Sequence, residues 1–225
     1  MTYTDMTTTA LTNVNPADYY HLDALRENGY CVLRDADFAI PEEEFMDMEY
    51  MDWKSGGDTN FAPIASAVGN IECAGFWEHS KPDKDGVWTK NADICPTLKK
   101  YVESIGANYG RVRTIKLNPQ SYETALTQIH LDDNNRINPK GTGWVVRTWL
   151  ELTETPGAAM ILRHVKDDPD TEVRLPLHKG MRYVVDSQRM YHVVMNPTDA
   201  ARYSLITSIE STPLLGEWIQ NNAPA

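Results

Sequence analysis

The chain has 225 residues, 41% of them hydrophobic, which fits one domain with a sizeable core. Its formal net charge of −11 argues against a nucleic-acid-binding protein, because such proteins need a basic face. No apolar run is long enough to cross a membrane, so we expect neither nucleic acid nor a membrane as partner. The sequence does not indicate an oligomeric state.

Three cysteines, at positions 31, 73 and 95, have no metal-binding spacing, and their odd number does not suggest a disulfide framework. The threonine-rich start lacks the basic and apolar parts of a signal peptide. We therefore expect a cytoplasmic protein with a single domain over residues 1–225 and a flexible tail over residues 1–14.

In chain order, the first predicted elements are helices and one strand. Asn15 and Pro16 are typical of a helix start, and Gly29 of a helix end, with a strand over residues 30–34 directly after it. A second helix is expected from Pro41 and a third over residues 96–105. The intervening residues 55–88 are rich in glycine and aromatic side chains, and we interpret them as part of a lid or cavity mouth; the alternative is a segment that wraps the domain and buries its aromatics.

The second half of the chain alternates apolar and polar residues in short runs separated by Pro, Gly, Asn and Asp. This pattern favours a mainly β fold, a double-stranded β-helix or cupin-like jelly roll with N-terminal and flanking helices. Its core would span residues 111–211. The eight expected strands are 111–117, 125–131, 144–152, 159–163, 172–175, 182–185, 191–195 and 202–209.

His130 and Asp132 are the most informative residues. If residues 125–131 form a strand, positions 130 and 132 point to the same face, and a second strand can deliver His192 to the same point. Two histidines and one carboxylate leave coordination positions open, as non-haem Fe(II) oxygenases require. The alternative for a lone His-x-Asp pair is a surface or core polar pair.

Arg202 and Ser204 follow His192 on the last expected strand, where alternation places both on one face. A guanidinium and a neighbouring hydroxyl together offer several hydrogen-bond donors to a carboxylate. An exposed Arg and Ser on a hairpin is the simpler interpretation, but the ordered set with His192 favours a ligand site.

Arg147 and Trp149 share one face of the strand over residues 144–152, together with Glu151. Burying the Arg147 cation is costly unless it is paired, either with a ligand carboxylate or with a nearby Asp or Glu. We take Arg147, Trp149 and Arg136 as candidate substrate-binding residues, although packing alone would explain Trp149 and a surface loop would explain Arg136.

The order His130-x-Asp132, His192, Arg202-x-Ser204 resembles the Fe(II)/2-oxoglutarate-dependent oxygenase superfamily. The resemblance implies that the first three residues bind Fe(II), that Arg202 and Ser204 hold 2-oxoglutarate, and that O2 is the oxidant; Gln128 is a further candidate for the co-substrate. The short spacing from His192 to Arg202 is similar to the aspartyl/asparaginyl β-hydroxylase-like members. Related halogenases have a small residue in place of the carboxylate, so Asp132 favours hydroxylation.

We therefore expect an oxygenase that hydroxylates a small molecule, an amino acid or a related metabolite, or oxidises it in another way by hydrogen abstraction. Two alternatives stay open: a hydroxylase of a residue in a protein, and a cupin-like metal-binding protein without 2-oxoglutarate chemistry. The sequence identifies neither the substrate nor the carbon that is oxidised.

Overall fold

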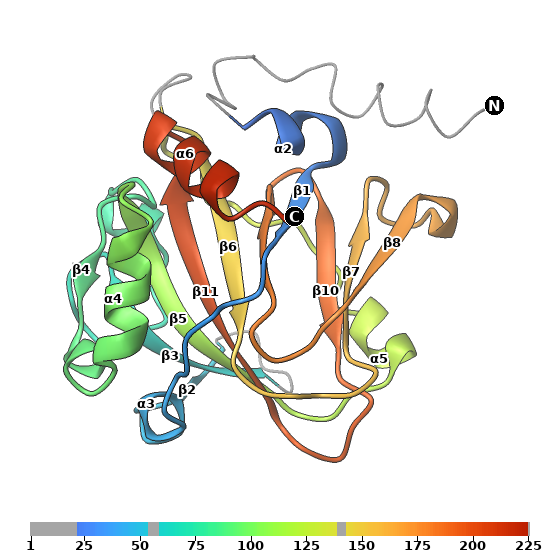
Figure 1. Cartoon of the computed structure of the whole chain (residues 1–225), viewed down its shortest axis with the longest axis horizontal. Helices are drawn as coiled ribbons and strands as arrows, with labels where there is room; N and C mark the ends of the chain where they lie inside the picture. Colours follow the sequence, from blue (N-terminus) through green and yellow to red (C-terminus); the bar gives the residue numbers. More distant parts are fainter. Residues whose placement is uncertain (1–21, 54–58, 139–142, 225) are drawn as a thin grey trace.

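Two antiparallel β-sheets form the centre of the molecule in this computed structural model, which describes residues 22–53, 59–138 and 143–224 (Figure 1). The larger sheet has the order β1-β9-β6-β11-β5-β3-β2, with β4 paired to β3, and the smaller has the order β10-β7-β8. The strands of the larger sheet are β1 (Tyr30–Leu33), β2 (Met51–Asp52), β3 (Thr59–Ser66), β4 (Val87–Trp88), β5 (Tyr109–Leu117), β6 (Val145–Glu151), β9 (Arg182–Val185) and β11 (Arg202–Glu210). Those of the smaller sheet are β7 (Ala159–Arg163), β8 (Glu172–Pro176) and β10 (Tyr191–Met195).

The two sheets pack against each other through apolar side chains. Trp149 and Tyr183 from the larger sheet share a buried cluster with Met160, Leu162 and Leu175 from the smaller one. Strand alternation explains this arrangement, since every second side chain of β6 and β9 points between the sheets. The predicted jelly-roll fold is confirmed.

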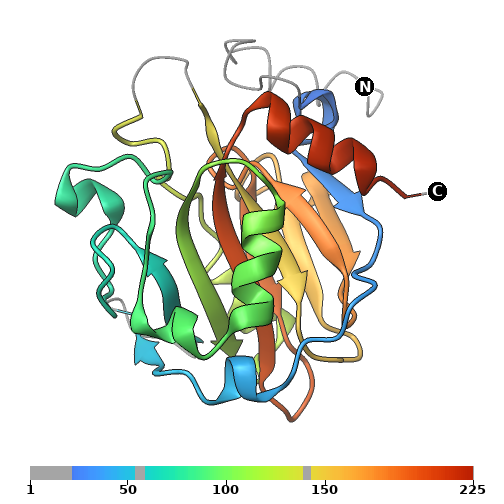
Figure 2. The same ribbon diagram turned by 60° about the vertical axis from the view of Figure 1, so that its left-hand side comes forward.

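The opposite face of the larger sheet carries a second apolar cluster, which helices cover (Figure 2). The covering helices are α2 (Asp23–Asn28), α3 (Glu43–Met46), α4 (Pro96–Ser104) and α6 (Pro213–Asn221), whereas α5 (Tyr122–Leu126) packs against the smaller sheet. Short 3-10 turns are η2 (Phe76–His79), η3 (Lys90–Asp93) and η4 (Pro169–Thr171). Leu98 of α4 and Leu215 of α6 pack here with Val146 and Leu150 of β6. The buried Glu44 accepts hydrogen bonds from the backbone N–H groups of Thr97 and Leu98, at the first turn of α4.

The strand expected over residues 125–131 is wrong. Residues 122–126 form α5, and His130 makes only an isolated bridge with His192. The cause is local: the Ser121 side chain accepts a hydrogen bond from the Thr124 backbone N–H and so caps a helix. The helix expected from Pro41 is the short α3, and the C-terminal helix α6 was not predicted.

The lid expected over residues 55–88 is also wrong for its described part. Thr59–Ser66 is β3, which lies within the larger sheet, and Thr59 is the sole described residue of the range that lines the cavity described below. Pro63 conceals the strand in the sequence, because proline cannot donate a ladder hydrogen bond. The register of β3 against β5 shifts between Pro63 and Ala65, which accommodates the proline.

The remaining expected elements agree with the structure to within a few residues. Gly29 ends α2 in the left-handed conformation, with φ of 73°. The expected helix start at Asn15 and the tail over residues 1–14 lie outside the described residues. All three cysteines are free. No helix in the described ranges has the length and apolar composition needed to cross a bilayer.

Candidate metal centre and cavity

A cavity of about 850 Å³ contains all of the sequence-predicted metal and co-substrate residues in its lining. Its walls are formed by β5, β6 and β11 of the larger sheet and by β10 of the smaller one. The three candidate metal ligands lie on its wall together with Arg202 and Ser204. A concave site with a few converging polar groups is the usual form of a small-molecule site.

The two histidines are brought together by a backbone bridge. The backbone N–H of His192 donates to the carbonyl of His130 at 2.9 Å, and the N–H of His130 donates to the carbonyl of His192 at 3.2 Å. Residues directly opposite in an antiparallel pair project to the same face. The two imidazole rings accordingly lie with their centroids 4.5 Å apart, so the pairing that the sequence analysis expected from a full strand is achieved by a single bridge.

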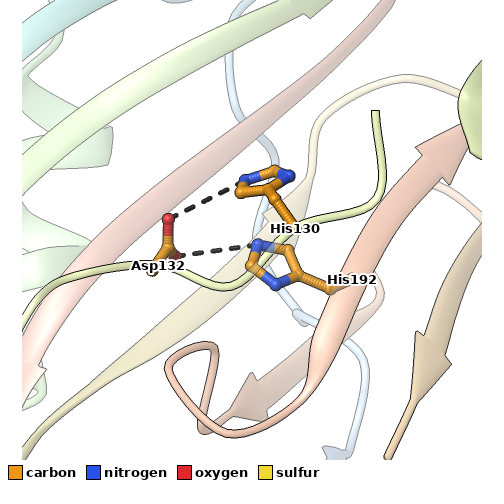
Figure 3. Close-up of side chains that lie close together, drawn as sticks. All are labelled: His130, Asp132 and His192. Atoms are coloured by element: carbon orange, nitrogen blue, oxygen red, sulfur yellow. Dashed lines mark ion pairs between the residues drawn. The ribbon is translucent and has the colours of Figure 1, made fainter. Parts of the chain in front are cut away.

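Asp132 completes the cluster from the loop that follows the bridge (Figure 3). Its backbone N–H donates to the carbonyl of Ser187 at 2.8 Å, which fixes the loop beside β10. Its carboxylate oxygens lie 3.9 Å from Nε2 of His130 and 3.7 Å from Nε2 of His192. Candidate ligand atoms from all three residues fall within 4.8 Å of one another.

Both imidazoles are oriented for metal binding by hydrogen bonds at the opposite nitrogen. Nδ1 of His130 lies 2.9 Å from the carbonyl oxygen of Gln128, and Nδ1 of His192 lies 3.1 Å from that of Met190. A carbonyl only accepts, so each Nδ1 carries the proton and each Nε2 keeps its lone pair. The residues present therefore fit a metal ion bound by two Nε2 atoms and one carboxylate.

The protonation states also suit a cation. Burial lowers the pKa of His192 to about 4, so the ring is neutral at neutral pH. Burial alone would raise the pKa of Asp132, but the charge of Arg147, and then His192 and His130, outweighs burial and holds that pKa well below its usual range. The site thus presents a negative carboxylate and the neutral imidazole of His192 to a cation.

Arg147 pairs with Asp132. Its Nε lies 2.7 Å from Oδ2 of Asp132, and its Nη2 donates to Oδ1 of Asn134 at 2.8 Å. Of the two partners expected for Arg147, a ligand carboxylate or a nearby Asp or Glu, the structure shows the second. Arg147 lines the cavity and orients Asp132, leaving Oδ1 on the side of His130.

Arg202 and Ser204 lie deep in the cavity wall, on β11. Arg202 donates through Nη2 to Glu151, which also accepts from the Tyr183 hydroxyl at 2.9 Å. Nε of Arg202 and Oγ of Ser204 are buried and have no hydrogen-bond partner among the described residues. The pair thus retains unused hydrogen-bonding capacity at the cavity, although Glu151 already compensates part of the charge of Arg202.

Glu151 and Tyr183 were not identified as site residues from the sequence. Alternation placed Glu151 on the same face as Arg147, and a carboxylate on a buried face was the available signal that it would pair with a cation. Tyr183 gave no signal, because its contact with Glu151 crosses from β9 to the end of β6.

The other three predicted residues have different positions. Trp149 lines the cavity, with its ring centroid 6.1 Å from that of His192 and stacked on Tyr183. Gln128 also lines the cavity, and its backbone carbonyl orients His130. Arg136 does not line the cavity: its guanidinium lies 4.0 Å from the centre of the Trp77 ring, on a half-exposed loop. The structure therefore places Arg136 outside this cavity, and its role in substrate binding stays a prediction.

Comparison of the sequence with family models and with curated proteins gives no match. Comparison of the structure with solved structures does give matches. A 2OG-Fe(II) oxygenase family oxidoreductase from Burkholderia pseudomallei superimposes with a TM-score of 0.52 and 15% identity, over 88% of this chain and 92% of that one.

Two further structures are similar over most of their length. The carbocyclase SnoK from nogalamycin biosynthesis, a non-heme alpha ketoglutarate dependent enzyme, gives a TM-score of 0.51 at 14% identity, over 89% of this chain and 85% of SnoK. A prolyl hydroxylase from Trichoplax adhaerens, in complex with a hypoxia inducible factor oxygen degradation domain peptide fragment, gives 0.50 at 12% identity, over 94% of both chains.

These likenesses show that the chain has the double-stranded β-helix fold of 2OG-Fe(II) oxygenases. At such low identity the fold is what they establish, and one fold can carry different activities. The expected nearness to the aspartyl/asparaginyl β-hydroxylase-like members stays a prediction.

Proposed function

We propose that the protein is an Fe(II)- and 2-oxoglutarate-dependent oxygenase that hydroxylates a small molecule, an amino acid or a related metabolite. The observation that carries the proposal is the shared cavity: the His130–Asp132–His192 cluster and the Arg202–Ser204 pair lie on its walls, and both sets have free ligand or donor atoms directed to it. The fold supports the proposal, since oxygenases of this kind are built on it.

Two sets of residues on the cavity wall would have different roles, one in metal binding and the other in co-substrate binding. His130, Asp132 and His192 would hold the metal, with Arg147 and the two backbone carbonyls orienting the ligands. Arg202 and Ser204 would bind the distal carboxylate of 2-oxoglutarate through Nε, Nη1 and Oγ. When bound, Fe(II) and 2-oxoglutarate supply the oxidising chemistry, in which O2 is consumed, 2-oxoglutarate becomes succinate and CO2, and a C–H bond of the substrate is hydroxylated.

The cavity supports a small substrate rather than a protein segment. Its volume of about 850 Å³ lies within the range of small-molecule sites, roughly 300–1,000 Å³. Trp149, Met160 and Ile206 supply apolar surface near the metal cluster, which would exclude water from the reacting carbon.

One observation favours the cupin-like alternative without 2-oxoglutarate chemistry. Arg202 already has a buried carboxylate partner in Glu151, so its role could be structural alone. Arg163 offers a control, because it also pairs with a carboxylate, that of Glu172, but lies outside the cavity lining. Comparing variants of the two arginines separates a ligand role from a structural one.

The test is succinate formation by the Fe(II)-loaded protein with 2-oxoglutarate and a panel of amino acids and related acids under air. We expect succinate from the wild type and from Arg163→Gln, and at least a tenfold higher KM for 2-oxoglutarate in Arg202→Gln. A correctly folded wild type that forms no succinate with any member of the panel contradicts the proposed activity. Equal kinetics of the two Arg variants would favour the cupin-like alternative.

A further inference from the structure

Besides Arg202, three arginines line the cavity that contains the metal cluster. Arg111 and Arg113 come from β5 and Arg147 from β6. On β5, every second residue from Arg111 to Leu117 faces the cavity, whereas Val112 packs in the apolar cluster under the helices. Strand alternation therefore directs two guanidinium groups of one strand into the same cavity.

Arg113 packs beside a pair of aromatic rings, Phe61 and Trp53, which also contact each other. Its guanidinium carbon lies 4.1 Å from the centre of the Phe61 ring and 4.9 Å from that of the Trp53 ring. The residue is 4% exposed, and its Nε and Nη1 atoms are buried without a hydrogen-bond partner among the described residues. A ring face attracts the cation but accepts no strong hydrogen bond, so Nε and Nη1 of Arg113 stay without an acceptor.

The other buried arginines of the described chain do not share this state. Arg147 pairs with Asp132, Arg163 with Glu172 and Arg202 with Glu151, while Arg182 donates to the backbone carbonyls of Arg34 and Asp35. Burying a cation without an acceptor is strongly unfavourable. Such a group persists where a ligand supplies the missing acceptor.

Asp83, an acid whose charge acts on Arg113, does not supply the missing acceptor. Asp83 accepts from the Arg111 backbone N–H at 2.7 Å and from the Ser208 hydroxyl at 2.9 Å, and it forms no ion pair with Arg113. Burial lowers the pKa of Arg113 well below its ordinary value, and the charges of Arg111 and Arg147 lower it further. Arg111 and Arg113 thus lie on this wall of the cavity with no ion pair to a carboxylate among the described residues.

We propose that Arg113, assisted by Arg111, binds an oxyanion of the substrate, a carboxylate or a phosphate, so that the substrate is an acidic small molecule. That the bound anion belongs to a substrate rests on the proposed function. The anion site itself rests on the position of Arg113. Guanidinium groups match both oxyanions, because two N–H donors point the same way. Arg147 contacts Asp132 of the metal cluster and lines the same cavity as Arg113.

The anion site differs from the one proposed for 2-oxoglutarate. Arg202 is paired in register with Leu117, and Arg113 with Ile206. Leu117 and Arg113 are four residues apart on β5, or roughly 13 Å at about 3.3 Å per residue. Two anionic groups can therefore be bound at once, 2-oxoglutarate near Arg202 and the substrate near Arg113.

The test is thermal unfolding of the full chain, loaded with Fe(II) and 2-oxoglutarate without oxygen, during titration with inorganic phosphate or with acetate. Chloride at equal ionic strength gives the reference. We expect a saturable rise in Tm with at least one oxyanion. In Arg113→Gln, the anion concentration that gives half of this rise should be at least tenfold higher. Arg182→Gln, which changes a buried arginine outside the cavity, should respond as the wild type does. A preference for phosphate or for acetate identifies the class of substrate.

The inference is overturned if neither oxyanion acts beyond chloride on the wild type, or if Arg113→Gln responds as the wild type does. Should Arg113→Gln not fold, Arg113→Lys must keep part of the response and Arg111→Gln must weaken it about threefold; an unchanged response in both contradicts the proposal. The same titration without metal and 2-oxoglutarate, compared between the wild type and Arg113→Gln, decides the anion site even if the proposed oxygenase activity fails.

Discussion

The two faces of the larger sheet come from the same strands but have opposite character. On the helix-covered face, β6 and β11 present Val146, Leu150, Leu205 and Ile209, all of which are buried in one apolar cluster. On the cavity face, the same two strands present charged and polar groups, among them Arg147, Arg202 and Ser204. The alternation of single residues thus separates the side chains that stabilise the fold from those that can bind ligands.

This contrast predicts different effects of substitution on the two faces. Changes on the helix-covered face should lower the free energy of unfolding without changing ligand affinity. Changes on the cavity face should alter ligand affinity, and their effect on stability should depend on whether a buried partner is left behind.

Arg202→Met has the largest expected effect, because it leaves Glu151 buried without its cation. Removing one partner of a buried ion pair costs about 3–5 kcal/mol, so chemical denaturation should show a loss of this size. The double variant Arg202→Met/Glu151→Gln should regain most of the stability but not the affinity for 2-oxoglutarate. If the double variant regains both, Arg202 has a structural role alone.

Leu150→Ala tests the helix-covered face of the larger sheet. Leu150 is fully buried, and a substitution of this kind costs about 2–5 kcal/mol of unfolding free energy. Because Leu150 points away from the cavity, affinity for 2-oxoglutarate, measured by calorimetry at a temperature where the variant is folded, should match that of the wild type. A large loss of affinity would show that the two faces are not independent.

Metal binding should stabilise the folded protein by an amount that depends on His192. At a metal concentration of 100 times Kd, the expected gain is about 2.7 kcal/mol, and a chelator should reverse it. His192→Ala should abolish the gain, whereas His164→Ala, at a histidine outside the cluster, should retain it. Equal metal-dependent rises in Tm for the two variants would place the metal elsewhere.

Arg113→Met has the smallest expected effect on stability, and its sign is the informative quantity. It removes a buried cation without orphaning a carboxylate, so the ligand-free protein should gain about 1 kcal/mol or stay unchanged. Arg163→Met, which removes one of the two arginines paired with Glu172, should instead lose stability. Denaturant titration of both variants gives the comparison, and a loss of several kcal/mol in Arg113→Met would indicate a structural role.

The sequence predicted the parts of the site that depend on strand alternation. Arg202, Ser204, Arg147 and Trp149 were all expected on single strand faces, and the structure places each of them on the cavity wall. His130 and His192 also meet as expected, although through one backbone bridge rather than a full strand pair. These contacts follow from period-two geometry and from the order of residues in the chain.

What the sequence did not predict depends on local capping or on tertiary contacts. Ser121 caps α5 where a strand was expected, and Pro63 concealed β3 in a range interpreted as a lid. Alternation on β5 would have placed Arg113 on the cavity face, but its lack of an acceptor depends on which residues surround it in space. Glu151 likewise became a site residue through its contacts with Arg202 and Tyr183.

The most direct measurement for the central claim is the visible absorption band that forms when 2-oxoglutarate chelates protein-bound Fe(II) without oxygen. The wild type and Arg163→Gln should both develop the band at similar 2-oxoglutarate concentrations. Arg202→Gln should require about ten to a hundred times more, because a hydrogen bond to a charged group contributes about 1.5–3 kcal/mol. A wild type that binds Fe(II) but forms no band, or an Arg202→Gln titration that matches the wild type, would contradict the account.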